Sequence, residues 1–555
     1  ATSFSVSWRT DTTVTTAYTE IALATLAPRF WRNAETMDAA TSTMDATNIA
    51  NAQIISNFHT VTFTGLQPNT LYAYRVGDGE VWSEWIQYRT AKAESEPFSF
   101  LYVGDTQNQI MELWSRLIRE GYRNQPDASF IIHAGDLVNR AHKDSEWHEW
   151  FEAGGWIHRM LPALPLPGNH EYNEYNPDED EEYLSKHWNF QFELPKNGPE
   201  GLEETAYYLD YQGARIVALN SNVMRAEQAE WLDQVLTENE QKWTILTFHH
   251  PIFSASAGRN NEQLRNLWKP VIDKHQVDIV LQGHDHSYAR GNTPPPAAEN
   301  EMSGVNTKDQ TGTVYVVSVS GGKMYTLRPD AWKDFEAKRM SAAENTQLFQ
   351  QIDISGDTLT YYSYTATREV YDAFYLIKNE DGPNRMVEIT DHRIPERRFN
   401  NTIPYDNPLA ITFETEKDED FLLDESDGSV SLTHDQARGG EHAASFTAGA
   451  RGPAYLTDHY EARYNNTTWY GFSVFMPEEL ESGQYTFAKW WYGEADNEYE
   501  INERPAPIQL QLHKGMLKIE AYSDANYYSK PETVQASAVN TRGNARFKSN
   551  AWNDL

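Results

Sequence analysis

The chain has 555 residues, of which 39% are hydrophobic and 13% aromatic, so it is long enough for several packed domains. Lys and Arg number 46 against 81 Asp and Glu; the net charge of -35 argues against nucleic acid as a partner, and no apolar run is long enough to span a membrane. Cysteine is absent, so disulfides and thiolate chemistry are excluded and any metal must use histidine and oxygen ligands.

Residues 1–92 are predicted to form a small β-sandwich. Apolar and polar residues alternate over Phe4–Trp8, His59–Phe63 and Leu71–Val76, and a turn is predicted at Gly65–Asn69. The stretch HTVTFTGLQPNTLYAYRVGDG resembles a fibronectin type III domain. The chain opens on ATSFSVSWRT, which is strand-like and not a leader, so we expect a secreted or periplasmic bacterial protein whose signal peptide has been removed.

A polar linker, AKAESEP, separates this sandwich from an α/β domain predicted over residues 97–395. Helical spacing of apolar residues predicts one helix near Trp114 and Leu117 and another near Leu264 and Trp268. The predicted buried strands are Phe98–Val103, Ser129–His133, Arg215–Leu219, Thr244–Phe248, Asp278–Leu281 and Val314–Val319. Two further strands are predicted within Gln347–Thr365.

Polar clusters follow the ends of these strands again and again. They are GDTQ at 104–107, GDLVN at 135–139, GNHE at 168–171, HHP at 249–251 and GHDH at 283–286. Because the carboxyl ends of strands in an open α/β sheet form the ligand crevice, we expect these clusters to converge in space. Glycine before each polar residue lets the backbone turn sharply over the sheet edge.

The clusters supply carboxylates, an amide oxygen and imidazoles, a ligand set suited to zinc, manganese or iron. Two ions fit this set better than one, with Asp136 bridging them. Asp105 and His286 would complete one ion, and Asn169, His249 and His284 the other. Two such ions lower the pKa of a shared water and neutralise phosphoryl oxygens, which would let a strongly acidic protein bind a phosphate ester.

The order GD, GD, GNHE, H and GHxH resembles the calcineurin-like metallophosphoesterase superfamily. GHDHSYAR at 283–290 and the preceding fibronectin-like domain are similar to its purple acid phosphatase branch. The resemblance implies that Asp136 is the bridging ligand, that His284 and His286 bind different metals, and that Asn169 and His249 bind the second. It also implies that His170 lies beside the substrate and binds the phosphoryl group or protonates the leaving oxygen.

Two residues depart from the pattern of these relatives. Asn139 stands where purple acid phosphatases carry a tyrosine, so the coloured ferric tyrosinate is not expected. Gln107 stands where many other members carry a histidine, and it could bind the first metal or orient a water. Three side chains are candidate substrate contacts, with structural roles as alternatives: Asn139, His250 and Arg290.

Residues 403–555 are predicted to form an incomplete, all-β jelly roll. TWYGFSVFMPEEL, FAKWW and APIQLQLHKGMLKIE resemble the jelly-roll polysaccharide lyases related to heparin lyase I. Gln511 and His513 share one face of a strand and, with Trp490, form a candidate glycan site. Glycan binding or a relict lyase is favoured over an active lyase.

The sequence therefore predicts a multidomain hydrolase with a dinuclear metal centre that cleaves phosphate esters, monoesters before diesters. The alternative is a carbohydrate-active protein, lyase or glycan-binding, with an auxiliary phosphoesterase domain. Expected partners are a small phosphate ester or a phosphorylated glycan and, less directly, an acidic polysaccharide; no membrane partner is expected. A joint role rests only on the domains sharing one chain.

Overall fold

The structure is a computed structural model of the chain. It describes residues 1–394 except 50–51, 173–182, 257, 296–308, 329–330, 334, 336 and 380–381, and beyond 394 only a set of strands between 422 and 554. The chain divides into two compact units, Ala1–Phe399 and Asn400–Leu555.

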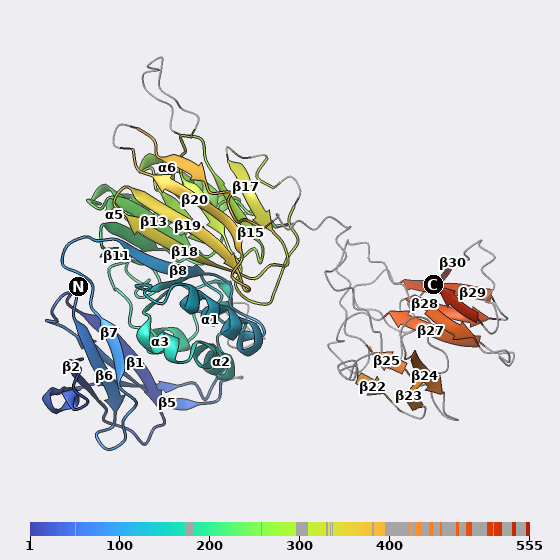
Figure 1. Ribbon diagram of the computed structural model, residues 1–555, viewed down its shortest axis with the longest axis horizontal. Helices are drawn as coiled ribbons and strands as arrows, with labels where there is room; N and C mark the ends of the chain where they lie inside the picture. Colours follow the sequence, from blue (N-terminus) through green and yellow to red (C-terminus); the bar gives the residue numbers. More distant parts are fainter. Residues whose placement is uncertain are drawn as a thin grey trace, which may run out of the picture. The chain divides into compact units, whose positions relative to one another are not determined.

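The N-terminal part of the first unit is a sandwich of two antiparallel sheets (Figure 1). One sheet has the order β1 (Phe4–Thr10), β5 (Ile55–Phe63), β4 (Ala40–Asp45); the other has the order β3 (Glu35–Asp38), β2 (Tyr18–Leu23), β6 (Leu71–Gly77), β7 (Ile86–Arg89). A short 3₁₀ turn, η1, spans Phe30–Asn33. Val61 and Phe63 of β5 pack against Tyr72 and Tyr74 of β6, so the apolar positions of alternating strands meet between the sheets. The predicted β-sandwich is confirmed.

The α/β part contains two seven-stranded sheets. The first has the order β10 (Ala163–Pro165), β9 (Ile131–His133), β8 (Phe98–Val103), β18 (Leu348–Ser355), β19 (Thr358–Thr365), β20 (Val370–Ile377), β21 (Arg385–Glu388). The second has the order β11 (Tyr207–Tyr211), β12 (Ala214–Ala218), β13 (Trp243–Phe248), β14 (Ile279–Gln282), β16 (Val314–Val317), β15 (Tyr288–Asn292), β17 (Lys338–Ala343). Strands β8, β9 and β10 are parallel, as are β12, β13, β14 and β16.

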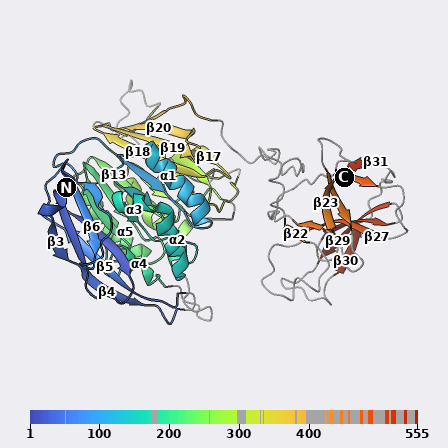
Figure 2. The same ribbon diagram turned by 60° about the horizontal axis from the view of Figure 1, so that its bottom comes forward.

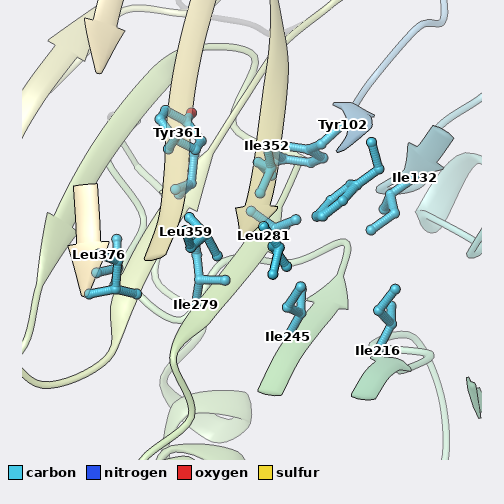
Figure 3. Close-up of a cluster of buried hydrophobic side chains, with 14 of the residues drawn as sticks. Tyr102, Ile132, Ile216, Ile245, Ile279, Leu281, Ile352, Leu359, Tyr361 and Leu376 are labelled. Atoms are coloured by element: carbon cyan, nitrogen blue, oxygen red, sulfur yellow. The ribbon is translucent and has the colours of Figure 1, made fainter. Parts of the chain in front are cut away.

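The two sheets pack face to face around one apolar core (Figure 3). Tyr102 and Ile132 of the first sheet face the same core as Ile216, Ile245 and Leu281 of the second. Because side chains alternate along a strand, the neighbouring apolar residues point to the outer faces, where helices cover them. The predicted strands read as continuous apolar runs for this reason: both of their faces are buried.

Helices cover both outer faces. The first sheet is covered by a π-helical turn, η2 (Ile110–Trp114), and by α1 (Ser115–Asn124), α2 (Asp144–Gly154) and α3 (Trp156–Met160). The second sheet is covered by α5 (Arg225–Thr237) and α6 (Glu262–Lys274). The predicted faces bury Trp114 and Leu117 in one case and Leu264 and Trp268 in the other. The central α/β sandwich is confirmed. Among the residues described, no helix has the length and apolarity needed to cross a bilayer.

The N-terminal sandwich is joined to the α/β part by specific contacts. Arg9 of β1 pairs with Asp144 of α2, Nη1 to Oδ1 at 2.7 Å, and Asp144 also contacts His187 at 3.0 Å. His187 begins the short helix α4 (His187–Gln191), which lies beside β4 and β5 (Figure 2). There the Phe58 and Phe190 rings lie 5.5 Å apart. The sandwich therefore contacts the helix that follows the second polar cluster, GDLVN.

The described part of the second unit consists of antiparallel strands. They are β22 (Leu422–Asp424), β23 (Ser429–Thr433), β24 (Ala443–Thr447), β25 (Tyr455–Thr457), β26 (Ser473–Met476), β27 (Gln484–Trp490), β28 (Ile508–His513), β29 (Met516–Ser523), β30 (Gln535–Val539) and β31 (Ala551–Asp554). The largest sheet has the order β27, β28, β29, β30. A mostly β region is confirmed, whereas the jelly-roll topology and the lyase resemblance remain predictions of the sequence.

Candidate metal centre

The polar clusters converge at the carboxyl ends of the strands, as predicted. Asp105 follows β8, Asp136 follows β9, Asn169 lies in the 3₁₀ turn η3 (Asn169–Glu171) after β10, and His249 follows β13. His284 and His286 follow β14. Four of these residues have left-handed backbone conformations, with φ of 53° at Asp105, 51° at Asp136, 72° at His284 and 48° at His286. Such strain in non-glycine residues persists where a functional arrangement demands it.

Glycines admit the close packing around these side chains. A Cβ on Gly168 would overlap the Asp136 carboxylate, and one on Gly283 would lie 2.5 Å from Asp105 Oδ2. The glycines before the polar residues therefore serve close approach as well as the sharp turn.

Two groups of ligand-type side chains share Asp136. One consists of Asp136, His249 and His284, and the other of Asp105, Asp136 and His286. In the first group, His249 Nε2 lies 3.2 Å from Asp136 Oδ2 and 3.1 Å from Asn169 Oδ1. His284 Nδ1 lies 2.9 Å from Asn169 Oδ1 and 3.1 Å from His249 Nε2. All six predicted ligands thus lie in one cluster with a shared carboxylate.

Gln107 lies beside the second group. Its Nε2 donates to Asp136 Oδ2 at 2.9 Å and lies 3.2 Å from His286 Nε2, while its buried Oε1 has no hydrogen-bond partner. His286 Nε2 lies 3.7 Å from Asp105 Oδ1. Rotating the Gln107 amide by half a turn would direct the orphaned oxygen toward the same carboxylate and imidazole. Gln107 is therefore placed to offer an oxygen ligand.

The hydrogen bonds of the imidazoles fix which nitrogen faces the cluster. His249 Nδ1 lies 2.9 Å from the Ala134 carbonyl, and His286 Nδ1 lies 3.0 Å from the Lys323 carbonyl. Since a carbonyl only accepts, Nδ1 of each ring carries a proton, and Nε2 is the nitrogen that faces the cluster and binds a metal when the ring is neutral. Lone pairs from imidazoles, carboxylates and an amide oxygen this close repel one another unless a cation lies among them. The donor set fits two metal ions.

Burial and neighbouring charges shift the pKa values here in opposite directions. Burial, opposed by the His249 charge, raises the pKa of Asp105 well above its usual range. Burial also opposes ionisation of Asp136, but the charge of His249 and its hydrogen bond hold the Asp136 pKa well below its usual range. Despite burial, the Asp136 carboxylate raises the pKa of His249 to about 9. Asp136 is thus the permanent anion of the cluster.

Glu171 is a supporting residue that the sequence analysis missed. Its buried carboxylate accepts hydrogen bonds from the backbone N–H groups of Asp136, Leu137, Val138 and Gly168. Burial and then the Asp136 charge raise the Glu171 pKa to about 8. The carboxylate ties two of the polar clusters together. Its position at the end of GNHE was the only available signal, and that signal does not indicate a partner.

His170 lies next to the bridging position. Its Nδ1 lies 2.6 Å from the carbonyl oxygen of Asn139, its Nε2 lies 3.9 Å from Asp136 Oδ2, and its side chain is 22% exposed. The ring thus lies at the open side of the cluster. The hydrogen bond to Asn139 uses the Asn139 backbone, so the residue in the tyrosine position orients His170 through its carbonyl group.

The two other predicted substrate contacts, His250 and Arg290, lie in different surroundings. The His250 ring centroid lies 4.2 Å from that of His284, its Nδ1 lies 2.8 Å from Ser221 Oγ, and burial followed by the His249 charge lowers its pKa well below the usual range. Arg290 takes the structural alternative, a salt bridge, in place of a substrate contact. Its fully buried guanidinium pairs with Asp372 at 2.7 Å and Glu388 at 2.6 Å, so both faces of its fork are used in the core.

The predicted glycan residues lie in the second unit. Gln511 and His513 are on β28, and Trp490 ends β27. The strand register pairs Trp490 with Ile508 and His513 with Gln484, so Trp490 lies at the far end of β28 from His513.

Comparisons with known proteins agree with this geometry. The family described as calcineurin-like phosphoesterase matches residues 98–288, and the family described as purple acid phosphatase, N-terminal domain, matches residues 1–90. This protein is a purple acid phosphatase-like metallophosphoesterase. Its metallophosphoesterase domain makes the chain a metal-dependent phosphoesterase, as the sequence predicted.

Individual relatives that match the chain are named purple acid phosphatases. A protein named Fe(3+)-Zn(2+) purple acid phosphatase 12 from Arabidopsis thaliana is 24% identical over 331 residues, which cover 56% of this chain and 69% of the relative. A purple acid phosphatase of Glycine max is 23% identical over 324 residues, 55% of this chain and 68% of the relative. The structure of purple acid phosphatase PPD1 from Lupinus luteus seeds has a TM-score of 0.56 and 19% identity, covering 68% of this chain and 73% of that chain. The metallophosphoesterase thus shares its fold with that phosphatase.

Proposed function

We propose that this metallophosphoesterase hydrolyses phosphate monoesters at a dinuclear centre bridged by Asp136. The shared position of Asp136 in both ligand groups is the observation that carries the proposal. Asp105, His286 and Gln107 would hold one ion, and Asn169, His249 and His284 the other. Ions at these positions supply an acidified water as nucleophile and neutralise the phosphoryl oxygens.

The protein's own residues complete the reaction. His170, with Nδ1–H bonded to the Asn139 carbonyl, presents Nε2 beside the phosphoryl position; in its doubly protonated form it would give the Nε2 proton to the leaving oxygen and remain as the neutral imidazole. His250 is held by Ser221 against His284 and would contact the phosphoryl group as a neutral imidazole. Monoesters are proposed before diesters because the relatives named above are phosphatases.

The metals are proposed to be zinc, manganese or iron. One relative carries Fe(3+) and Zn(2+) in its name, and the donor set here is compatible with both. Asn139 removes the tyrosine expected of a purple centre, so an iron-loaded protein should lack the purple colour. The comparisons favour the phosphoesterase over the carbohydrate-active alternative, and a secreted or periplasmic location in a bacterium remains a prediction from the sequence.

Chelation and substitution test the proposal together. Treatment with EDTA should abolish hydrolysis of 4-nitrophenyl phosphate, and zinc or manganese should restore it. Asp136→Asn, which preserves the shape of the side chain, should lose activity and bind less than two metals per chain. Asp372→Asn removes a buried carboxylate elsewhere in the domain and should keep both metals when folded. Undiminished hydrolysis by metal-free protein or by Asp136→Asn would refute the dinuclear mechanism.

A further inference from the structure

A group of cations lies beside His286 and has no assigned role in the reaction. The Tyr325 ring lies 4.7 Å from the His286 ring, the Arg259 guanidinium lies 4.9 Å from the centre of the Tyr325 ring, and Lys323 Nζ lies 5.6 Å from it. We call Arg259, Lys323 and Tyr325 the cationic shelf. Both charges are attracted to the same aromatic ring next to the candidate centre.

The shelf is fixed to the candidate ligand by its backbone. The Lys323 carbonyl accepts from His286 Nδ1 at 3.0 Å, and the Tyr325 N–H donates to the His286 carbonyl at 2.8 Å. Arg259 donates to the carbonyl oxygen of His284. The position of the shelf relative to both histidines is therefore set by short contacts, as a specificity subsite requires.

The charges of the shelf are incompletely neutralised. Arg259 Nη1 lies 3.9 Å from Asp285 Oδ1, beyond hydrogen-bond distance, while the other oxygen of that carboxylate accepts from Ser254 and from two backbone N–H groups. Within the described parts of the chain, no carboxylate lies within ion-pair distance of Lys323 Nζ. Lys323 and Arg259 are both partly exposed.

We propose that the cationic shelf binds a second anionic group of the substrate, a carboxylate or phosphate, while the phosphoryl group occupies the dinuclear centre. This inference rests on the proposed phosphoesterase function and deepens it. The preferred substrates are then phosphate esters whose alcohol portion carries its own negative charge. Lys323 supplies the unpaired charge, and Tyr325 holds that charge at the edge of the centre. Local cations also offset the repulsion between an anionic substrate and the acidic surface.

Binding of a matched, non-hydrolysable pair tests this preference without requiring turnover. The probes are 3-phosphonopropionate and its methyl carboxylate ester, which differ in the charge of one group. Calorimetry on the metal-loaded full chain should give about tenfold tighter binding of the charged probe, and the ratio should shrink as salt screens the pair. Lys323→Met should bring the ratio close to one, and Lys323→Arg should restore it.

The matched control is Lys338→Met. Lys338 is an exposed residue at the start of β17, paired with Asn292 at the end of β15 away from His286, and its substitution should preserve the ratio. A wild-type ratio of one, or an unchanged ratio in Lys323→Met, would overturn the subsite. Loss of binding of both probes by folded, metal-loaded protein would overturn both proposals. If the protein cleaves 4-nitrophenyl phosphate but binds the two probes equally, only the cationic shelf is overturned. If it binds the charged probe more tightly but cleaves no phosphate ester, only the phosphatase proposal is contradicted.

Discussion

The carbonyl oxygen of Asn139 lies 2.6 Å from Nδ1 of His170. Because the carbonyl can only accept, this contact places the proton on Nδ1 and directs Nε2 toward the Asp136 side of the ring. The Asn139 N–H donates in turn to Glu146 of α2, and Asp144 of the same helix pairs with Arg9. The orientation of the candidate acid is thus linked to the N-terminal sandwich through these hydrogen bonds and helix α2.

Removal of the His170 imidazole should slow catalysis more for esters with poor leaving groups. His170→Ala should lower kcat by about 10²- to 10⁴-fold on an alkyl phosphate, because a general acid contributes about that much. The loss should be smaller on 4-nitrophenyl phosphate, whose leaving group needs no proton. Steady-state rates on the two esters measure the difference, with His148→Ala, an exposed residue of α2, as control. Equal losses on both esters would rule out an acid role.

Substitution of Glu171 should loosen the bridging loop. Glu171→Gln retains an acceptor oxygen but turns an NH₂ group toward backbone N–H groups that the carboxylate now binds. We expect metal affinity to fall about 10- to 100-fold, the usual effect of losing support behind metal ligands. Competitive titration against a metal chelator measures it, and Glu152→Gln, at an exposed position of α2, should show no change.

Gln107 should tune the first metal position. Gln107→His introduces the histidine that many superfamily members carry there and should raise affinity for zinc at one of the two positions. Gln107→Leu removes the polar end of the side chain and should lower that affinity. Metal content measured after dialysis, combined with a zinc titration, distinguishes the two metal positions. If His, Gln and Leu gave the same two-metal affinities, residue 107 would not be a ligand.

The ion pair of Arg290 should matter for stability and not for substrate binding. Asp372→Asn leaves the buried guanidinium without its main charged partner, so unfolding free energy should fall by about 3 to 5 kcal/mol. Denaturant titration measures the loss. Replacing both partners, with Arg290→Met and Asp372→Leu, should recover part of the loss, and KM of the folded double variant should stay near that of wild type. A large rise in KM without a loss of stability would instead indicate that Arg290 contacts the substrate.

His133 should make the fold sensitive to acid. Its fully buried ring packs edge-on against Trp114 and Trp150, and burial holds its pKa well below the usual range. A depressed histidine pKa means that the unfolded chain binds the proton first. The stabilising effect is therefore complete above the unfolded pKa of about 6.5 and is lost below it, by up to about 1.4 kcal/mol per pH unit.

Unfolding free energy measured from pH 7 to pH 5 tests this effect. His133→Phe keeps an aromatic ring and removes the titrating group, so its stability should vary less with pH. His148→Phe, at an exposed position, should keep the wild-type slope. Identical slopes in wild type and His133→Phe would show that His133 is protonated in the folded state.

The sequence by itself predicted the buried strands and the set of candidate metal ligands. Each buried strand, from Phe98–Val103 to Val314–Val317, is a local apolar run, and each ligand cluster directly follows a strand or turn. Local pattern and the geometry of sheet edges were therefore sufficient to predict that Asp105, Asp136 and their partners lie together. The antiparallel outer strands, such as β15 and β17, were not predicted because their residues alternate weakly and their pairing is long-range.

Only the tertiary structure decided what the residues around the ligands do. Arg290 lies four residues after His286, yet its partner Asp372 comes from β20, and the pairing takes it into the core. Glu171 acquires its role from backbone groups of another cluster, and Lys323 reaches His286 from beyond β16. These roles depend on contacts between residues distant in the chain, and such contacts exist only after the two sheets have packed.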